Sequence, residues 1–217
     1  MTDGIAWLAA PQPIACGGYR VVLARGLSHE ELAGRLASTV EFAGGYTAVP
    51  VGEHTNSSFT QVLDDALADP FAGIDIGPRL GCSGGWVYAV ACGCWPGEFG
   101  PLEAVSRDGA HVFLLEYEEE NGKPVPPQFE YFHDDRLLSA FNLHLNSSWG
   151  YEGVQGDPAT ADRLQERLTA AGLPDPGRKR REVHLTTLRI VQDFFGLSLP
   201  RDPIVNGPLP AVLLEPA

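Results

Sequence analysis

The run GCSGG at 81–85 places a serine among glycines, as the nucleophile loop of trypsin-like serine proteases does. Such a nucleophile needs an earlier histidine base, a buried carboxylate that orients the base, and an acid beside the serine. Cys82 occupies the place of that acid. Only His29 and His54 precede Ser83, and neither lies in a matching segment. We therefore expect these glycines to turn the chain into a strand.

The run ACGCW at 91–95 has the residue types of a papain-type cysteine nucleophile, and NSSWG at 146–150 resembles the asparagine segment of that group. In that group the histidine follows the cysteine by about 130–150 residues. His144 follows Cys94 much too closely for this order. We therefore expect Cys92 and Cys94 to face the same way on a strand as small core side chains. A redox role of the two thiols is the alternative.

Metal and cofactor motifs are weak in this chain. A zinc site built from Cys82, Cys92 and Cys94 needs a fourth ligand, for which Cys16 or His111 could serve. A Cys-x-Cys pair without a Cys-x-x-Cys partner is poor support for such a site. Four common motifs do not occur in the sequence. They are the phosphate-binding loop G-x-x-x-x-G-K-[ST], the dinucleotide-binding G-x-G-x-x-G, the zinc-protease H-E-x-x-H and the serine-hydrolase G-x-S-x-G. We expect no metal, no cofactor and no catalytic residue.

Several charged and aromatic side chains suggest binding. The acidic run EYEEEN (116–121) lies at the rim of a hairpin, where it could dock a basic partner or keep a strand edge from pairing with other chains. The basic run GRKRRE (177–182) precedes a helix, where positive charge opposes the helix dipole, so a partner contact or a solvated linker would explain it. The polar turn in YFHDDR (131–136) could touch a ligand. The candidate binding residues are Trp86, Tyr88, Glu116, Glu118, Glu119, Glu120, His133, Asp134, Asp135, Arg178 and Arg180.

The first half of the chain predicts strands that surround a capped helix. The β-rich run 19–27 leads into a helix that Ser28 and Glu31 mark with a capping box. A second helix is expected near 58–68, with Ser57 or Ser58 as its cap. The run 84–93 is apolar on both faces, which indicates a central strand. Further strands are expected at 110–118 and, as two strands joined at HDD, within 128–144.

The second half predicts two helices and a last strand. Asp157 caps the first helix, Pro158 takes its first position and Gly172 ends it. The second helix covers 181–196. The run 207–216 is expected to be an edge strand, because prolines disfavour a central place. In the 128–144 hairpin, alternation puts Phe129, Tyr131 and His133 on one face, and Leu138, Ala140 and Asn142 together on one face of the partner strand.

These elements predict an α+β fold. We expect a single domain over 1–217, with a mostly antiparallel sheet of about five to six strands and helices packed on one face. The irregular region 43–80 is expected to be an insert or a divergent segment.

Charge and composition narrow the function classes. The net charge is −13, from 28 acidic and 15 basic residues, which disfavours general nucleic-acid binding and suits solubility or a basic partner. No apolar run approaches the roughly 20 residues that span a bilayer, so we expect no membrane association. The N-terminus has no basic n-region, which favours the cytoplasm. Four cysteines do not make a disulfide scaffold.

The order of several segments resembles an actinobacterial family of uncharacterised proteins. VVLARGLSHEELAGRLA is similar to the R-G-L-[ST]-x-E-E opening segment of that family, and GGWVYAV to its Gly-Trp strand. FEYFHDDRLLSAFN and the segments SSWGYEG, DPATADRLQERLTAAGL and LRIVQDFFGLSLPRDPIVNGPL are similar to its later strands and closing helices. The resemblance covers about 19–215 except 43–80. It implies a fold and no activity.

Together these observations predict a non-enzymatic, acidic cytoplasmic binding or regulatory protein with a protein partner. One concrete form is an immunity-type protein that masks a basic surface. The alternative is a small-molecule-binding protein or an enzyme, with a pocket near the 84–95 strand and the 128–144 hairpin. The oligomeric state is left open.

Overall fold

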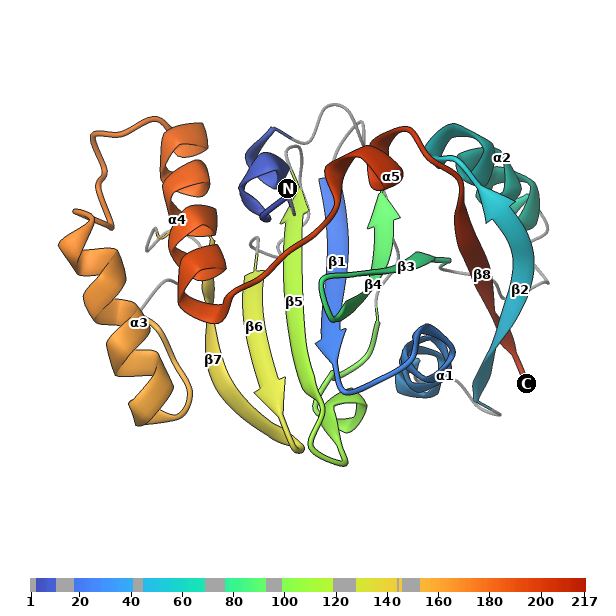
Figure 1. Cartoon of the computed structure of the whole chain (residues 1–217), viewed down its shortest axis with the longest axis horizontal. Coiled ribbons are helices and arrows are strands. Elements are labelled where there is room, and N and C mark those ends of the chain that lie inside the picture. The colour runs from blue at the N-terminus through green and yellow to red at the C-terminus, as the bar shows by residue number, and fades with distance from the viewer. Residues whose placement is uncertain are drawn as a thin grey trace.

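The computed structural model describes residues 3–10, 18–40, 45–68, 77–92, 99–118, 128–143, 145 and 153–217. Within these residues one antiparallel sheet runs through the molecule in the order β2-β8-β3-β4-β1-β5-β6-β7 (Figure 1). Its strands are β1 (Gly18–Arg25), β2 (Tyr46–His54), β3 (Arg79–Ser83), β4 (Trp86–Cys92), β5 (His111–Glu118), β6 (Gln128–His133), β7 (Arg136–Asn142) and β8 (Leu209–Pro216).

The α+β class is confirmed, but the predicted strand number is too low. The described residues form 8 strands. The two additional strands are β2, which lies in the region 43–80 for which the sequence predicted no strand, and β3, which begins at the end of that region and continues to Ser83. The burial of β2 does not alternate, and a register shift between Pro50 and Gly52 interrupts it. β3 has only 5 residues. Neither strand therefore carries a period-two pattern long enough to read.

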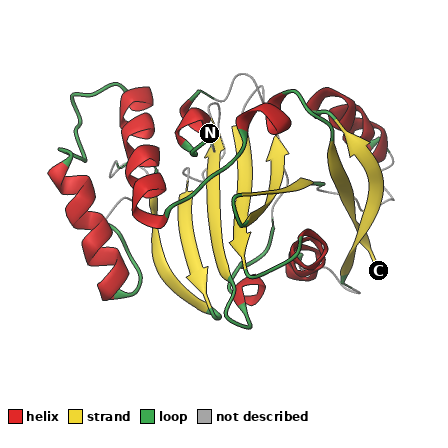
Figure 2. Cartoon of the chain, viewed as in Figure 1, coloured by secondary structure: helices red, strands yellow, loops and turns green. Residues whose placement is uncertain are grey.

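Helices cover both faces of the sheet, which corrects the expectation of one covered face. They are α1 (His29–Thr39), α2 (Asn56–Leu67), α3 (Pro158–Ala170), α4 (Arg180–Phe195) and α5 (Arg201–Val205), with the short 3-10 helices η1 (Ala6–Ala9) and η2 (Ala104–Ser106). Figure 2 shows helices at both ends of the row of strands. None of the helices in the described part of the chain has the length and apolarity that a membrane crossing requires.

Separate hydrophobic clusters on the two faces of the sheet explain this arrangement. On one face, Tyr19, Val21 and Leu23 of β1 pack in a cluster with residues of α3 and α4 such as Leu164 and Leu188. On the other face, the alternate residues of β1 pack in a second cluster with α1. We call these the α4 face and the α1 face. A sheet with apolar side chains on both sides must bury both.

Helix α1 begins as its sequence predicts. The Ser28 side chain accepts a hydrogen bond from the Glu31 backbone N–H at 3.1 Å, and the Glu31 carboxylate accepts one from the Ser28 backbone N–H at 2.7 Å. These two bonds satisfy donors that the first helical turn otherwise leaves without partners.

We expect Ser28→Ala to lower the free energy of unfolding by about 1 kcal/mol, because the alanine cannot accept the bond from the helix. For a chain of this size the melting temperature should fall by about 2–4 °C. Thermal unfolding followed by circular dichroism measures the change. Glu31→Gln keeps an acceptor at this position and should lose much less. Equal losses in the two variants would contradict the capping role.

The other helices match the sequence in part. α3 has Asp157 as its N-cap residue and Pro158 in its first turn, and α4 ends at Gly196 with a φ of 66°. The predicted start of α3 and end of α4 are confirmed, but the Asp157 side chain makes no capping hydrogen bond and pairs with Arg136 instead. For α2 the predicted cap is wrong. The cap is Thr55, whose side chain accepts a bond from the Ser58 backbone N–H, so the helix starts earlier than expected.

The predicted edge position of the last strand is also wrong. β8 pairs with β2 along its whole length and with β3 at one position, Arg79 opposite Ala211. Its two prolines, Pro210 and Pro216, lie near its ends and leave the residues between them free to pair. β2, which contains Pro50, is the edge strand instead.

Candidate functional site

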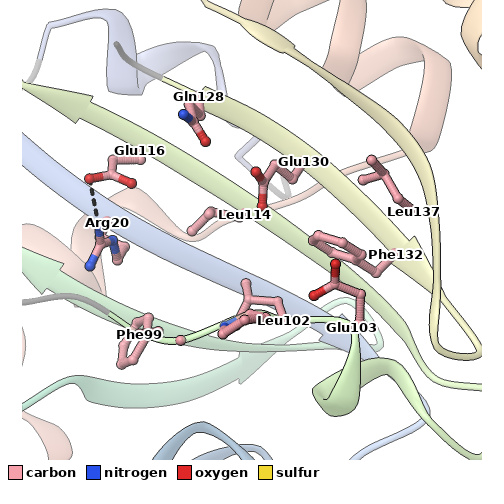
Figure 3. Close-up of a pocket in the computed structure, with 12 residues that line it drawn as sticks. Arg20, Phe99, Leu102, Glu103, Leu114, Glu116, Gln128, Glu130, Phe132 and Leu137 are labelled. Atoms are coloured by element: carbon pink, nitrogen blue, oxygen red, sulfur yellow. Dashed lines mark hydrogen bonds and ion pairs between the residues drawn. The ribbon is translucent and has the colours of Figure 1, made fainter. Parts of the chain in front are cut away.

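A cavity of about 310 Å³ opens on the α1 face, over β1, β5, β6 and β7 (Figure 3). Its floor is the sheet, and the segment 99–103 forms its roof. Four of its lining residues are ionisable, and most of the others are apolar. They are Arg20, Phe99, Gly100, Pro101, Leu102, Glu103, Leu114, Glu116, Gln128, Glu130, Phe132 and Leu137. We call this cavity the acidic pocket.

Strand register builds one wall of the acidic pocket. Arg20 lies opposite Glu116, and Glu116 lies opposite Gln128. Residues directly opposite each other share a face of the sheet, so the three polar side chains form a row. The Arg20 guanidinium donates to the Glu116 carboxylate at 2.5 Å, and both side chains are buried. This ion pair fixes the charges at one end of the cavity.

Glu130 stands one row further along the same strands, opposite Leu114. It is half-buried, and its carboxylate points into the cavity (Figure 3). Burial, together with the nearby charges of Glu103 and Glu116, raises the pKa of Glu130 to about 7 against a weaker opposing effect of Arg20. No described residue forms a hydrogen bond or an ion pair with this carboxylate. Glu130 is therefore a carboxyl group that changes charge near neutral pH inside a cavity.

Helix α1 holds the roof in place. The Gly100 backbone N–H donates to the Thr39 hydroxyl at 3.0 Å, and a Cβ on Gly100 would collide with the Thr39 carbonyl oxygen. Only glycine can approach the helix end this closely. Arg35 donates to the carbonyl oxygens of Val105 and Arg107 and pairs with Asp108 at 2.9 Å. The roof is thus anchored on both sides of Glu103.

The roof is also tied to the β6–β7 turn. Ser106 is fully buried, its carbonyl oxygen accepts from the Asp134 backbone N–H at 3.0 Å, and its hydroxyl accepts from the Asp135 backbone N–H at 2.9 Å. Asp134 and Asp135 both have positive φ, as a two-residue hairpin turn requires. These bonds set the distance between the roof and the strand that carries Glu130.

The chemistry of the acidic pocket favours a cation. Three carboxyl groups, from Glu103, Glu116 and Glu130, face one guanidinium, from Arg20. Opposite charge nearby favours the ionised form of a carboxyl group, so a bound cation would lower the pKa of Glu130. Phe99 and Phe132 add apolar surface, which suits a hydrocarbon stem. The geometry can therefore bind a positively charged group that carries an apolar body.

A larger groove of about 580 Å³ lies between α1 and the strands β2 and β8. Small and apolar side chains dominate it, among them Ala33, Ala37, Ala48 and Val212. Nothing in the structure indicates what covers it. We therefore place the candidate site at the acidic pocket, where buried charges meet a cavity.

The structure separates most of the predicted site residues from this pocket. Trp86 and Tyr88 are buried on the α4 face. Trp86 donates to the Gly196 carbonyl oxygen at 3.2 Å and meets Phe113 edge-on. Burial raises the pKa of Tyr88 to about 12. Both side chains stabilise the core on the side opposite the acidic pocket.

Glu116 of the acidic run lines the pocket. Glu118 is the last residue of β5, and Glu119 and Glu120 lie outside the described residues. His133 ends β6, and Asp134 and Asp135 form the turn that follows it.

The basic run lies apart from the pocket. Arg178 and Arg180 are both exposed, and Arg178 pairs with Asp175 at 3.1 Å. Arg180 is the first residue of α4. Neither contributes to the acidic pocket.

Cysteine chemistry finds little support among the described residues. Burial raises the pKa of the Cys92 thiol to about 12, against the opposing effect of Arg79. A thiol with so high a pKa is a poor nucleophile. Cys94 lies outside the described residues. The prediction that Cys92 and Cys94 face the same way on a strand therefore stays a prediction. Within the described ranges, no three Cys, His, Asp or Glu side chains converge as a metal site requires.

Sequence reasoning missed Arg20, Glu103, Gln128 and Glu130. Two signals were available. Arg20 is a charged residue next to the apolar run 21–24 of its strand, and Gln128 and Glu130 alternate with Phe129 and Tyr131. A polar face on the strand 128–133 could therefore be predicted from the sequence. The residues that lie opposite it on neighbouring strands could not. Glu103 carried no signal, because only the tertiary structure places its segment over the strands.

No protein-family model matches this chain, and neither a curated protein nor a solved structure does. The resemblance to an actinobacterial family stays a prediction.

Proposed function

We propose that this protein is an acidic binding protein whose acidic pocket takes a cationic group on an apolar stem. The observation that carries the proposal is the placement of Glu130. Its carboxylate points into the cavity, has no partner among the described residues, and lies near two further carboxyl groups. A carboxylate in such a position is stabilised by a bound cation more strongly than one in water, because the surrounding dielectric is low.

Two sources can supply this chemistry. One is a free alkylamine. The other is a lysine side chain on a basic partner protein, which the net charge of −13 favours through long-range attraction. The second source corresponds to the regulatory or immunity-type role expected from the sequence. In both cases Glu130 receives the ammonium and the apolar lining receives the hydrocarbon chain.

Calorimetric titration with butylammonium tests the proposal and should detect binding near pH 8. The amine stays charged there, because an alkylamine titrates near the lysine value of about 10.4. The ammonium competes with a proton for Glu130, whose pKa is about 7. Affinity should therefore fall about tenfold per pH unit as the pH drops below that value. Butanol has the same stem without the charge and should not bind.

Matched variants sharpen the result. Glu130→Gln keeps the shape of the side chain and removes its charge, and should weaken butylammonium binding about tenfold or more. Glu166→Gln, on the exposed surface of α3, should bind as the natural protein does. Equal binding of butanol and butylammonium, or unchanged binding by Glu130→Gln, would refute the proposal. A lysine-containing peptide titrated in parallel separates a partner's side chain from a free amine.

The pKa of Glu130 favours a second candidate function, which is general acid–base catalysis. A pKa of about 7 is near the value at which a carboxyl group both accepts and donates protons efficiently at neutral pH. Mass spectrometry of the amine recovered after incubation distinguishes the two. An unchanged mass supports binding, and a changed mass that Glu130→Gln prevents supports catalysis.

A further inference from the structure

A row of basic side chains crosses the α4 face, where β1 ends and β5 begins. Arg25 lies opposite His111, His111 lies opposite His133, and His133 lies opposite Arg136. Opposite residues share a face, so these four side chains form one line across four neighbouring strands. We call this line the basic row. It lies on the reverse side of the sheet from the acidic pocket.

The basic row stands at the border of the core. The next residues along the strands, Phe113 and Tyr131, stack on each other with ring centroids 4.2 Å apart, and Phe195 of α4 covers them. The two histidines beyond this cluster are half-buried, and the two arginines are exposed. Positive groups gathered at one place are notable in a chain with a net charge of −13.

The two histidines are held in a fixed arrangement. Their rings are parallel within 4°, and their centroids are 4.0 Å apart. His111 Nδ1 lies 2.8 Å from the Tyr131 hydroxyl, and His133 Nδ1 donates to the Ala110 carbonyl oxygen at 3.2 Å. In the described part of the chain no hydrogen bond engages Nε2 of either ring. Both rings therefore have one nitrogen bound to the protein and one left for a ligand.

Arg25 completes the group. Its guanidinium carbon lies 4.1 Å from the centroid of the Trp86 ring, a contact that holds the side chain in place. None of the ion pairs among the described residues involves Arg25. Burial lowers the pKa of His111, and the positive charges of His133 and Arg25 lower it further. The protonated group thus lacks a compensating negative charge.

We propose that Arg25, His111 and His133 bind a tetrahedral dianion, such as the phosphate group of a small phosphorylated molecule or a sulfate ion. Arg25 offers a planar fork of N–H donors, which suits such oxygens. Each protonated imidazole adds an Nε2–H donor. The alternative of a metal ion is disfavoured, because the guanidinium beside His111 repels a cation.

Binding of this dianion requires proton uptake. Neutral His133 carries its proton on Nδ1, where it donates to Ala110, so Nε2 presents a lone pair that repels an anion. Affinity should therefore rise as the pH falls, by about tenfold per pH unit for each proton taken up. This direction is opposite to that expected for a cation in the acidic pocket. The two sites can thus be distinguished in one sample.

The other charged groups around the row have partners of their own. Arg136 pairs with Asp157 at 3.6 Å, at the far end of the row from Arg25. Asp135 pairs with Arg107 at 3.4 Å, and the Asp134 carboxylate accepts from the Gly109 backbone N–H at 3.3 Å. Tyr131 contacts His111 and is uncharged at neutral pH, since burial raises its pKa.

Sulfate is the appropriate probe, because its charge stays constant between about pH 5 and pH 8, where histidine titrates. Nuclear magnetic resonance of the histidine rings, at ionic strength held constant with chloride, should show sulfate raising the pKa of both His111 and His133. Calorimetric affinity should be higher near pH 5.5 than near pH 7.5. Acetate, a monoanion, should bind much more weakly. An unchanged histidine pKa with saturating sulfate would overturn the proposal.

Variants test the assigned residues. Arg25→Gln should weaken sulfate binding about tenfold or more near pH 6. His133→Gln should reduce the rise in affinity at low pH to the part that His111 contributes, while the interaction through Arg25 remains. Arg189→Gln removes an exposed arginine from α4 and should have no effect. Equal losses in Arg25→Gln and Arg189→Gln would show general charge attraction and overturn the assignment, provided that melting curves show each variant folded.

Discussion

Replacing Glu130 by glutamine is expected to make the protein more stable at pH 8 and to remove a pH dependence that the natural protein shows. In the unfolded chain this carboxyl titrates near 4.5, and in the folded protein its pKa is about 7. Between these values the folded state holds a proton that the unfolded state has lost. The stabilising contribution of the protonated form is therefore complete below about pH 4.5 and is lost as the pH rises through 7.

Glutamine stays neutral at every pH, so the variant avoids this loss. The gain in unfolding free energy at pH 8 should be about 1–3 kcal/mol, a range that allows for solvent screening of a half-buried group. The melting temperature should rise by about 2–4 °C for each kcal/mol. Chemical denaturation at a series of pH values measures the difference, which should shrink as the pH falls toward 5.

Two controls isolate the cause. Glu166→Gln on the surface of α3 should leave stability within about 0.5 kcal/mol. Glu103→Gln should lower the pKa of Glu130, because it removes the nearby charge that raises this pKa most. If Glu130→Gln were no more stable than the natural protein at pH 8, the carboxyl would not be held in the low-dielectric environment that the acidic pocket requires. Gained stability with lost ammonium binding would identify a group kept for function at a cost in stability.

Removing only one side of the Arg20–Glu116 pair should produce the largest loss of stability among these variants. Both side chains are buried, at 6% and 8% exposure, so either charge left alone would lack compensation. Arg20→Met should cost about 3–5 kcal/mol in unfolding free energy. It also removes the positive charge that moderates the pKa of Glu130, which should then rise further.

The double variant Arg20→Met with Glu116→Leu is the informative comparison. With both charges gone, the apolar replacements should recover most of the loss, because a buried ion pair and a well-packed apolar pair are often nearly equivalent. Urea denaturation of the four proteins gives the coupling energy, which should exceed about 2 kcal/mol. Arg178→Leu, which breaks the exposed pair with Asp175, should cost less than about 1 kcal/mol. Additive losses in the double variant would contradict a direct interaction between Arg20 and Glu116.

These variants also bear on the expected function. The sequence predicted an acidic binding protein and, as the alternative, a small-molecule-binding protein or enzyme with a pocket near the 84–95 strand and the 128–144 hairpin. No described residue of the 84–95 strand lines the acidic pocket. One face of that hairpin, with Phe129 and Tyr131, is packed in the core. Its other face, with Gln128 and Glu130, lines the acidic pocket. Binding studies at the acidic pocket therefore test the partner form of the prediction and the hairpin part of the small-molecule form.

The elements that the sequence predicted well depend on local signals. The capping box of α1, the Asp157–Pro158 start of α3 and the glycine that ends α4 each act within a few residues of chain. The two-residue turn at Asp134–Asp135 is local in the same sense. Such signals are readable because the groups that satisfy them are neighbours in the sequence.

In the β6–β7 hairpin, the alternation of residues along the sequence did not predict correctly which side chains share a face. Alternation placed Leu138, Ala140 and Asn142 on one face, but the register shifts beside Tyr131 and Phe132. Leu138 therefore packs against the core on the α4 face, while Ala140 lies opposite Glu130 and Asn142 opposite Gln128. The bulge brings Leu137 to the lip of the acidic pocket. One irregular pair in the ladder thus decided which residues reach the cavity.

The sequence by itself determined the α+β class, one end of each of three helices and the central place of the Trp86 strand, because caps, turns and apolar runs act over short distances. Tertiary structure alone decided that helices cover both faces, that β8 lies inside the sheet, and that Arg20, Glu103, Glu116 and Glu130 share one cavity. Those four residues come from three strands and a roof segment. Only strand register and the anchoring of that segment on α1 bring their charges together, and neither is encoded in the spacing of neighbouring residues.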